Sequence, residues 1–228
     1  MTPPERRYVP NLDEHVRNIV RWHFSETTGS PFWLRMAGSL SFDPLRDVRG
    51  FDDLSKFPAV VPMWRTTPTS ELVPRGIDGH YFVFETGGTT GAPTRVAAGP
   101  EKFENVERVS ELLDEHQFPG WDRSDGVCRK VERTESWLYL GATGPHGVGR
   151  VVQRLAHVRG YLCHTVDMDP RWVRRLEREG RSEEMQAYVG HLLQQAHWVL
   201  KGDRVTALVT IPPLLRAIIA NPELHDLV

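Results

Sequence analysis

The spacing of hydrophobic residues divides the chain into two parts. The first part has short secondary-structure elements, and the second has alternating strands and helices. Apolar residues recur every three or four positions from Leu12 to Phe24, which predicts a helix that Asn11 can cap. Five prolines between residues 32 and 79 exclude long elements there. We therefore expect residues 1–79 to form a loop-rich, partly helical region.

From residue 80 onward the periodicity switches repeatedly between the two types of element. The spacing predicts strands at 80–85, 94–98, 137–140, 161–166 and 205–210. It predicts helices at 151–158, 171–179 and 183–200, a further helix that begins at residue 100 and a last one that ends at residue 219. Such alternation is typical of α/β folds with parallel pairings and flanking helices. We expect residues 80–228 to be an α/β portion of the same large domain as residues 1–79.

Composition and charge narrow the class of protein. The 228 residues include 28 basic and 30 acidic side chains, and a net charge of −2 argues against a duplex nucleic-acid binder. No apolar run reaches the roughly 18 residues of a membrane helix, and the N-terminus does not resemble a signal peptide. Two cysteines, Cys128 and Cys163, fit a reducing compartment rather than a disulfide framework. These features predict a cytoplasmic protein without membrane or nucleic-acid partners.

The most informative segment is the glycine and threonine loop from Thr86 to Arg95. Its glycines allow backbone conformations closed to other residues, and successive backbone N–H groups in such a turn can form an anion nest. It matches neither the Walker pattern nor the dinucleotide glycine fingerprint. From the residues alone, a phosphate-binding loop and a plain hairpin turn both remain open.

The segment from Val83 to Thr94 resembles the phosphate-binding signature of the adenylate-forming superfamily, which follows a hydrophobic strand in those enzymes. Residues upstream, including Ser30-Pro31-Phe32 and Phe51 to Leu54, are similar to the N-terminal region of the phenylacetate–CoA ligase-like branch. Downstream, Gly144 to Gly149 resembles the histidine-containing turn near the acyl pocket of that family. The similarity thus extends in order along most of the chain.

This resemblance implies an AMP-forming ligase that uses ATP to convert a carboxylic acid to an acyl-adenylate, with CoA or a carrier-protein thiol as acceptor. It implies phosphate binding by Thr86, Gly87, Gly88, Thr89, Thr90, Gly91 and Arg95. It also implies that Mg²⁺ enters with the nucleotide, that His146 lines the acyl pocket and that no residues form a separate metal site. The catalytic residues and the acid remain unassigned.

The chain departs from the family pattern in two respects. Ala92 stands where the loop usually has a lysine, and Arg95 is the nearest cation that follows. The family's later adenine- and magnesium-binding motif and its C-terminal lid domain are not found by Val228. We therefore expect either the front part of a longer enzyme or a non-catalytic nucleotide-binding or scaffold remnant.

Other candidate residues have structural explanations. His146 can satisfy loop carbonyls instead of lining a pocket, and Asp167 and Asp169 can bind a cation, although Asp169 fits better as the cap of the following helix. The basic residues of that helix (Arg171, Arg174, Arg175, Arg178 and Arg181) predict a solvated surface paired with nearby glutamates. The seven tryptophans are expected mostly in the core, with one or two available to line an aryl pocket.

Overall fold

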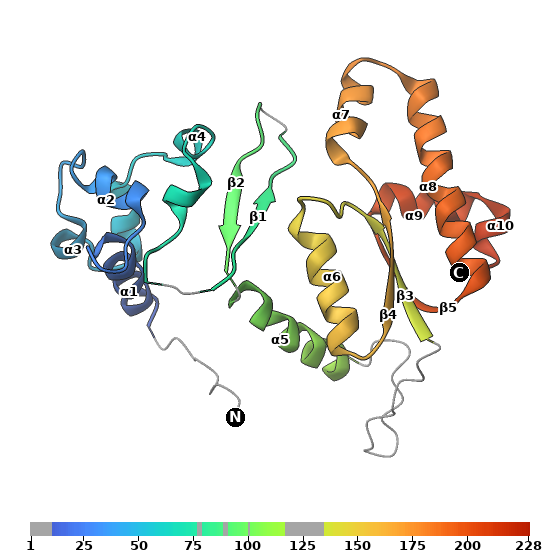
Figure 1. Cartoon of the computed structure of the whole chain (residues 1–228), viewed down its shortest axis with the longest axis horizontal. Helices are drawn as coiled ribbons and strands as arrows, with labels where there is room; N and C mark the ends of the chain where they lie inside the picture. Colours follow the sequence, from blue (N-terminus) through green and yellow to red (C-terminus); the bar gives the residue numbers. More distant parts are fainter. Residues whose placement is uncertain (1–10, 77–78, 89–90, 100, 117–134) are drawn as a thin grey trace. The chain divides into compact units, whose positions relative to one another are not determined.

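The computed structural model describes residues 11–76, 79–88, 91–99, 101–116 and 135–228. Contacts between residues divide the chain into two compact units. Unit 1 comprises Met1–Val83 and Thr94–Gly99, and unit 2 comprises Phe84–Pro93 and Pro100–Val228. Figure 1 gives the order of the elements along the chain.

Unit 1 is built from short helices. They are α1 (Leu12–Phe24), α2 (Pro31–Ala37), α3 (Pro44–Asp47), the 3₁₀ helix η1 (Phe51–Lys56), α4 (Val61–Trp64) and the 3₁₀ helix η2 (Thr69–Leu72). As predicted, α1 spans Leu12–Phe24, and the Asn11 side chain accepts hydrogen bonds from the backbone N–H groups of Asp13 and Glu14. Its buried Val16, Val20 and Phe24 form a core cluster with Val48.

Two short strands flank the glycine loop. Strand β1 (Phe82–Glu85) and strand β2 (Arg95–Ala98) pair in a two-stranded sheet. Both coincide closely with the predicted extended segments. The glycine loop is therefore the connection between two paired strands.

The main body of unit 2 is a three-stranded parallel sheet with strand order β4-β3-β5. Its elements are α5 (Glu101–Glu115), β3 (Glu135–Gly141), α6 (Gly147–Val158), β4 (Leu162–Asp167), α7 (Pro170–Arg178), α8 (Ser182–Gly202), β5 (Arg204–Thr210), α9 (Pro212–Ala220) and α10 (Pro222–His225). The predicted α/β class with parallel pairing is thus confirmed.

Strand β3 organises the core because both of its faces are covered. Trp137 and Tyr139 pack in a cluster with residues of α5 and α6, whereas Leu138 and Leu140 pack with residues of α8 and α9. This alternation follows from the two-residue period of a strand. Burial on both faces explains why the predicted strand at 137–140 is a continuous apolar run, as is typical of central parallel strands.

Some expected core positions lie at the surface. Trp198 on α8 is 62% exposed, which contradicts its expected place in the core. Val109 and Leu112, on the predicted apolar face of α5, are 39% and 38% exposed. Among the described residues, no helix is both long and apolar enough to cross a membrane.

Candidate functional site

The site begins where the parallel strands end, which is the edge at which open α/β sheets commonly bind ligands. At the end of β4, the Asp167 carboxylate accepts hydrogen bonds from the backbone N–H of Thr143, at 2.8 Å, and from the Thr143 hydroxyl, at 2.5 Å. These bonds connect the segments that follow β3 and β4. Helices α6 and α7 both start beside this edge.

Helix α7 starts with the cap that the sequence predicts. The Asp169 side chain accepts a hydrogen bond from the backbone N–H of Arg171 at 2.9 Å, and Pro170 occupies the first turn. The preference of Asp169 for a capping role over cation binding is therefore borne out. Among the described residues, no group of three or more His, Cys, Asp or Glu side chains is placed to hold a metal ion.

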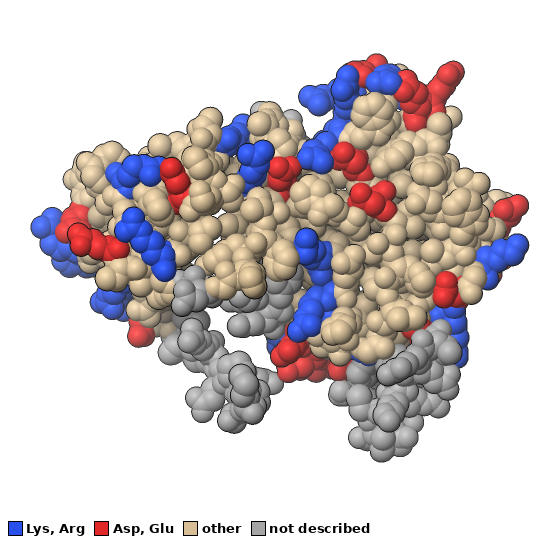
Figure 2. Space-filling view, viewed as in Figure 1, with Lys and Arg blue, Asp and Glu red and all other residues tan. Residues whose placement is uncertain are grey.

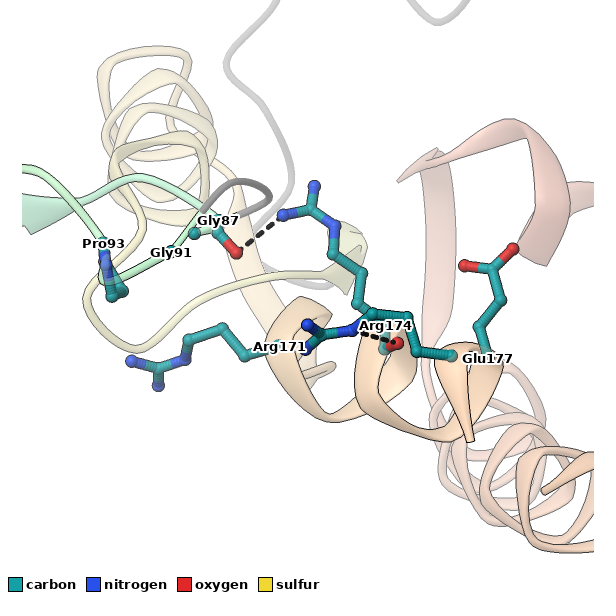
Figure 3. Close-up of a pocket in the computed structure, with 8 residues that line it drawn as sticks. Gly87, Gly91, Pro93, Arg171, Arg174 and Glu177 are labelled. Carbon is teal, nitrogen blue, oxygen red and sulfur yellow. Dashed lines mark hydrogen bonds between the residues drawn. The ribbon is translucent and has the colours of Figure 1, made fainter. Parts of the chain in front are cut away.

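The glycine loop contacts α7 through two arginines. Arg174 Nη1 donates a hydrogen bond of 2.6 Å to the carbonyl oxygen of Gly87, and Arg171 Nη1 forms a 2.9 Å ion pair with Oε2 of Glu85. A Cβ added at Gly87 would lie 2.3 Å from Arg174 Nη1. The absence of a side chain at Gly87 is therefore what lets the guanidinium approach the backbone (Figure 3).

A cavity of about 430 Å³ opens between the loop and α7. Its lining residues are Gly87, Gly88, Gly91, Pro93, Arg171, Arg174, Glu177 and Arg178. Figure 3 shows Arg174 reaching toward Gly87 from α7. With three arginines and one glutamate, the lining carries a net charge of +2, which favours anions over cations.

Two of these cations have no carboxylate partner within the part of the chain that the structure describes. Arg174 donates to the Gly87 carbonyl, and Arg178 Nε donates to the Arg174 carbonyl at 3.4 Å, but neither forms an ion pair there. They stand four residues apart on a short helix, where like charges repel. Arg171 is a third cation in the lining, and it pairs with Glu85 and, at 3.2 Å, with the helix cap Asp169.

Two further arginines, Arg175 of α7 and Arg181 at the start of α8, pair with glutamates as the sequence predicts. Arg175 pairs with Glu179 at 2.9 Å, and Arg181 pairs with Glu179 and Glu184. Figure 2 shows blue and red side chains intermixed near α7 and the start of α8. The prediction of a solvated surface paired with glutamates is therefore right for Arg175 and Arg181. Arg171 is also exposed and pairs with Glu85 and Asp169, whereas Arg174 and Arg178 donate to backbone carbonyls instead of glutamates.

The predicted phosphate-binding residues are not all brought to this cavity. Gly87, Gly88 and Gly91 line it, and the positive φ angles of Gly88 (64°) and Gly91 (142°) require glycine. Thr86 is exposed just before them, whereas Thr89 and Thr90 lie outside the described residues. Arg95 belongs to unit 1, where it lines a different cavity.

His146 lies at the start of α6. Its Nδ1 is 3.2 Å from the carbonyl oxygen of Glu85, and the backbone N–H of Glu85 donates to the carbonyl of Pro145 at 2.9 Å. This is the carbonyl contact that the residues alone left open. The Nε2 atom of His146 is buried and has no hydrogen-bond partner among the described residues. A role in an acyl pocket remains a prediction.

Cys163 does not line this cavity. Cys163 is half buried in β4, and burial raises the pKa of its thiol, which disfavours the reactive thiolate. Cys128 lies outside the described residues.

Comparison with known proteins adds no family assignment. No family model matches this chain, and a search of curated proteins gives no match. The interpretation of the site therefore depends on its own geometry and on the loop's sequence.

Proposed function

We propose that the glycine loop and the arginines of α7 bind the phosphate groups of ATP, and that the chain acts in the activation of a carboxylic acid as an acyl-adenylate. The observation that carries the proposal is the pair Arg174 and Arg178. Both guanidinium groups line the loop cavity, and neither has a carboxylate partner among the described residues.

Electrostatics favour a multiply charged anion at this position. Arg174 and Arg178 repel each other across one helical turn. An anion in the cavity relieves this repulsion. A polyphosphate offers several oxygens to the forked guanidinium groups, and glycine residues allow its close approach to the backbone.

The acid-activation step comes from the resemblance of Val83 to Thr94 to the adenylate-forming signature. A carboxylate oxygen attacks the α-phosphorus of ATP, the bond from that phosphorus to the bridging oxygen breaks, and pyrophosphate leaves with the electron pair. A thiol, such as that of CoA or a carrier protein, then attacks the acyl carbon and releases AMP. In this scheme the loop and α7 hold the leaving pyrophosphate and stabilise its charge.

Magnesium enters this scheme as a companion of the nucleotide. Mg²⁺ prefers oxygen ligands, retains several waters and is commonly held by substrate phosphates together with one or two carboxylates. Glu177 is the carboxylate that lines the cavity. We assign it no coordination role, because phosphate oxygens supply the charge that the ion requires.

Calorimetric titration with Mg-ATP tests phosphate binding directly. Replacing Arg174 and Arg178 together by glutamine should weaken binding by about 100-fold or more, since each hydrogen bond to a charged group contributes about 1.5–3 kcal/mol. Arg175→Gln is the matched control, because Arg175 lies on the same helix but pairs with Glu179 away from the cavity. Unchanged affinity in the double variant, or an equal loss in the control, contradicts the proposal.

A second candidate function is nucleotide binding without catalysis, which the replacement of the usual loop lysine by Ala92 favours. Exchange of labelled pyrophosphate into ATP separates the two. The assay uses a panel of carboxylic acids, with the chain supplemented by the C-terminal part of a phenylacetate–CoA ligase. Acid-dependent exchange supports the ligase, whereas ATP binding without exchange supports the second candidate.

A further inference from the structure

Glu85 lies where strand β1 ends and the glycine loop begins, and three interactions hold it there. Its backbone N–H donates a hydrogen bond of 2.9 Å to the carbonyl oxygen of Pro145, and its own carbonyl oxygen lies 3.2 Å from Nδ1 of His146. Its Oε2 forms the 2.9 Å ion pair with Arg171. Glu85 therefore joins the end of β1 to the turn after β3 and to the start of α7, all within unit 2.

The groups that hold Glu85 are themselves fixed at the edge of the parallel sheet. Asp167, at the end of β4, accepts two hydrogen bonds from Thr143 in the turn that contacts Glu85. Arg171 also pairs with Asp169, the cap of α7, at 3.2 Å. The position of Glu85 is thus set by two routes from the end of β4, one through the turn and one through the helix cap.

The glycine loop that follows depends on such external contacts for its order. Gly87, Gly88 and Gly91 have no side chains that could pack against the rest of the unit, and glycine loses more conformational freedom than other residues when it is fixed. Fixing the backbone of one residue lowers an equilibrium constant by about five- to thirtyfold. A loop that is ordered in the free protein therefore binds a ligand more tightly, because the ligand does not have to order it.

We propose that Glu85 is a positioning residue for the phosphate site. Its backbone holds the first residues of the glycine loop against the turn after β3, and its carboxylate holds Arg171 beside the loop (Figure 3 shows Arg171 and Arg174 on α7). Glu85 does not line the cavity, so it acts through the loop and Arg171. This inference rests on the function proposed above, because it takes the loop cavity as the site of the phosphates.

Charge alone and positioning predict opposite effects for the loss of this carboxylate. By charge alone, removing a negative group beside Arg171 should strengthen the binding of an anion. By positioning, removing the Glu85 side chain should weaken binding, because Arg171 loses one of its two carboxylate partners and the ligand has to order the loop. The Glu85 side chain is only 18% exposed, so solvent screens its ion pair less than a surface pair. We expect the positioning effect to be the larger one.

Calorimetric titration of the full chain with Mg-ATP measures the sign. Glu85→Ala should weaken binding by about fivefold or more, the effect of ordering one residue. Glu85→Gln keeps an oxygen that can accept the hydrogen bond from Arg171, so it should retain or increase the affinity. Glu177→Gln is the matched control, because it removes the same charge from an exposed residue of the cavity lining. It should strengthen binding by about two- to fivefold, as expected for the loss of one like charge in solvent.

A measurement without ligand separates this inference from the proposed function. Relaxation of ¹⁵N reports the order of the Gly87 and Gly88 amides, whose order parameters should fall from about 0.85 to below about 0.6 in Glu85→Ala. The order should stay at the wild-type level in Glu85→Gln and Glu177→Gln. A wild-type chain that fails to bind Mg-ATP, together with this fall in order, contradicts the proposed function and supports the positioning role.

Three results overturn the positioning role. They are tighter Mg-ATP binding by Glu85→Ala, unchanged order of the two glycine amides in that variant, and order parameters already below about 0.6 in the wild-type chain. Should Glu85→Ala fail to fold, Arg171→Ala removes the same ion pair from its other side, and the order of the Gly87 amide should fall in that variant too.

Discussion

The cavity beside the glycine loop is lined by three arginines and a glutamate, whereas the cavity in unit 1 is lined mainly by aromatic and aliphatic side chains. The first has cations without carboxylate partners, and the second has buried dipoles without hydrogen-bond partners. The unpaired cations favour an anion in the first cavity, whereas the second cavity offers mainly apolar surface to a ligand. The unmet interactions of a cavity are thus more informative than its size, because the two volumes, about 430 and 450 Å³, are nearly equal.

Glycines serve different purposes in the two units. At Gly87 the missing side chain admits the mobile end of Arg174, whereas at Gly29 in unit 1 it admits rigid backbone. A methyl group is cheap to accommodate in the first case and expensive in the second. Alanine substitutions at these glycines therefore test whether the local structure depends on a close approach of backbone or of a side chain.

The largest effect is expected for Gly29→Ala. The added Cβ would lie 2.4 Å from the carbonyl oxygen of His23 and 2.7 Å from that of Ser25, so the end of α1 would have to move. We expect a loss of about 2–3 kcal/mol in the free energy of unfolding, measured by urea denaturation. Gly38→Ala is the control, because its nearest contact would be 3.6 Å, and a loss of similar size there would contradict this explanation.

A smaller effect is expected from removing the cap of α7. Asp169→Ala leaves the N–H of Arg171 without its acceptor and should cost about 1 kcal/mol of stability. Because α7 carries the arginines of the loop cavity, fraying of its first turn should also weaken Mg-ATP binding. Asp169→Asn retains a capping oxygen and should preserve both properties, so a full loss in that variant would show that charge rather than capping matters.

Two exposed glycines with open space around them provide a finer test of backbone conformation. Gly190→Ala, within α8, should raise stability by about 0.5–1 kcal/mol, because alanine loses less conformational entropy in a helix. Gly180→Ala should lower it by about 1 kcal/mol, since Gly180 has a φ of 66°. Thermal unfolding of the two variants measures the change in stability that each alanine causes. Stability changes of the same sign in both variants would contradict the different backbone conformations of Gly180 and Gly190.

These contrasts also show what sequence can and cannot predict. The spacing from Leu12 to Phe24 predicts α1 correctly, and Asp169 is predicted as a cap, because both depend on neighbours within a few residues. Charge spacing likewise predicts the Arg175–Glu179 pair. By contrast, the contact between Arg174 and Gly87 joins residues 87 positions apart, and no local pattern contains it.

The aromatic cavity could not be predicted for the same reason. Six elements contribute to it, and the sequence indicates only that tryptophans and phenylalanines are available in residues 11–72. A helical stripe also overstates burial, because Val109 and Leu112 share the predicted face of α5 yet remain more than one-third exposed. Periodicity shows which face a helix can bury, and only the packing of distant elements shows how much of it is buried.

The smallest expected effect concerns pH and separates the two cavities by their titratable groups. Burial lowers the pKa of His23 below its usual 6.5, so the unfolded chain binds a proton more readily than the folded one. The contribution of His23 to stability is fully present above pH 6.5 and is lost as the pH falls below that value.

Urea denaturation between pH 7 and pH 5 measures this contribution. The free energy of unfolding should fall less steeply in His23→Leu than in the wild-type chain, while His191→Gln, on the exposed side of α8, should match the wild type. This window lies well above that of Asp47, where a hydrogen bond from Arg46 lowers the carboxyl pKa to about 2 and stability is lost only as the pH falls below about 4. Equal slopes for His23→Leu and the wild type would mean that the imidazole is protonated as easily in the folded chain as in water. The surroundings of His23 would then be wetter than its burial indicates.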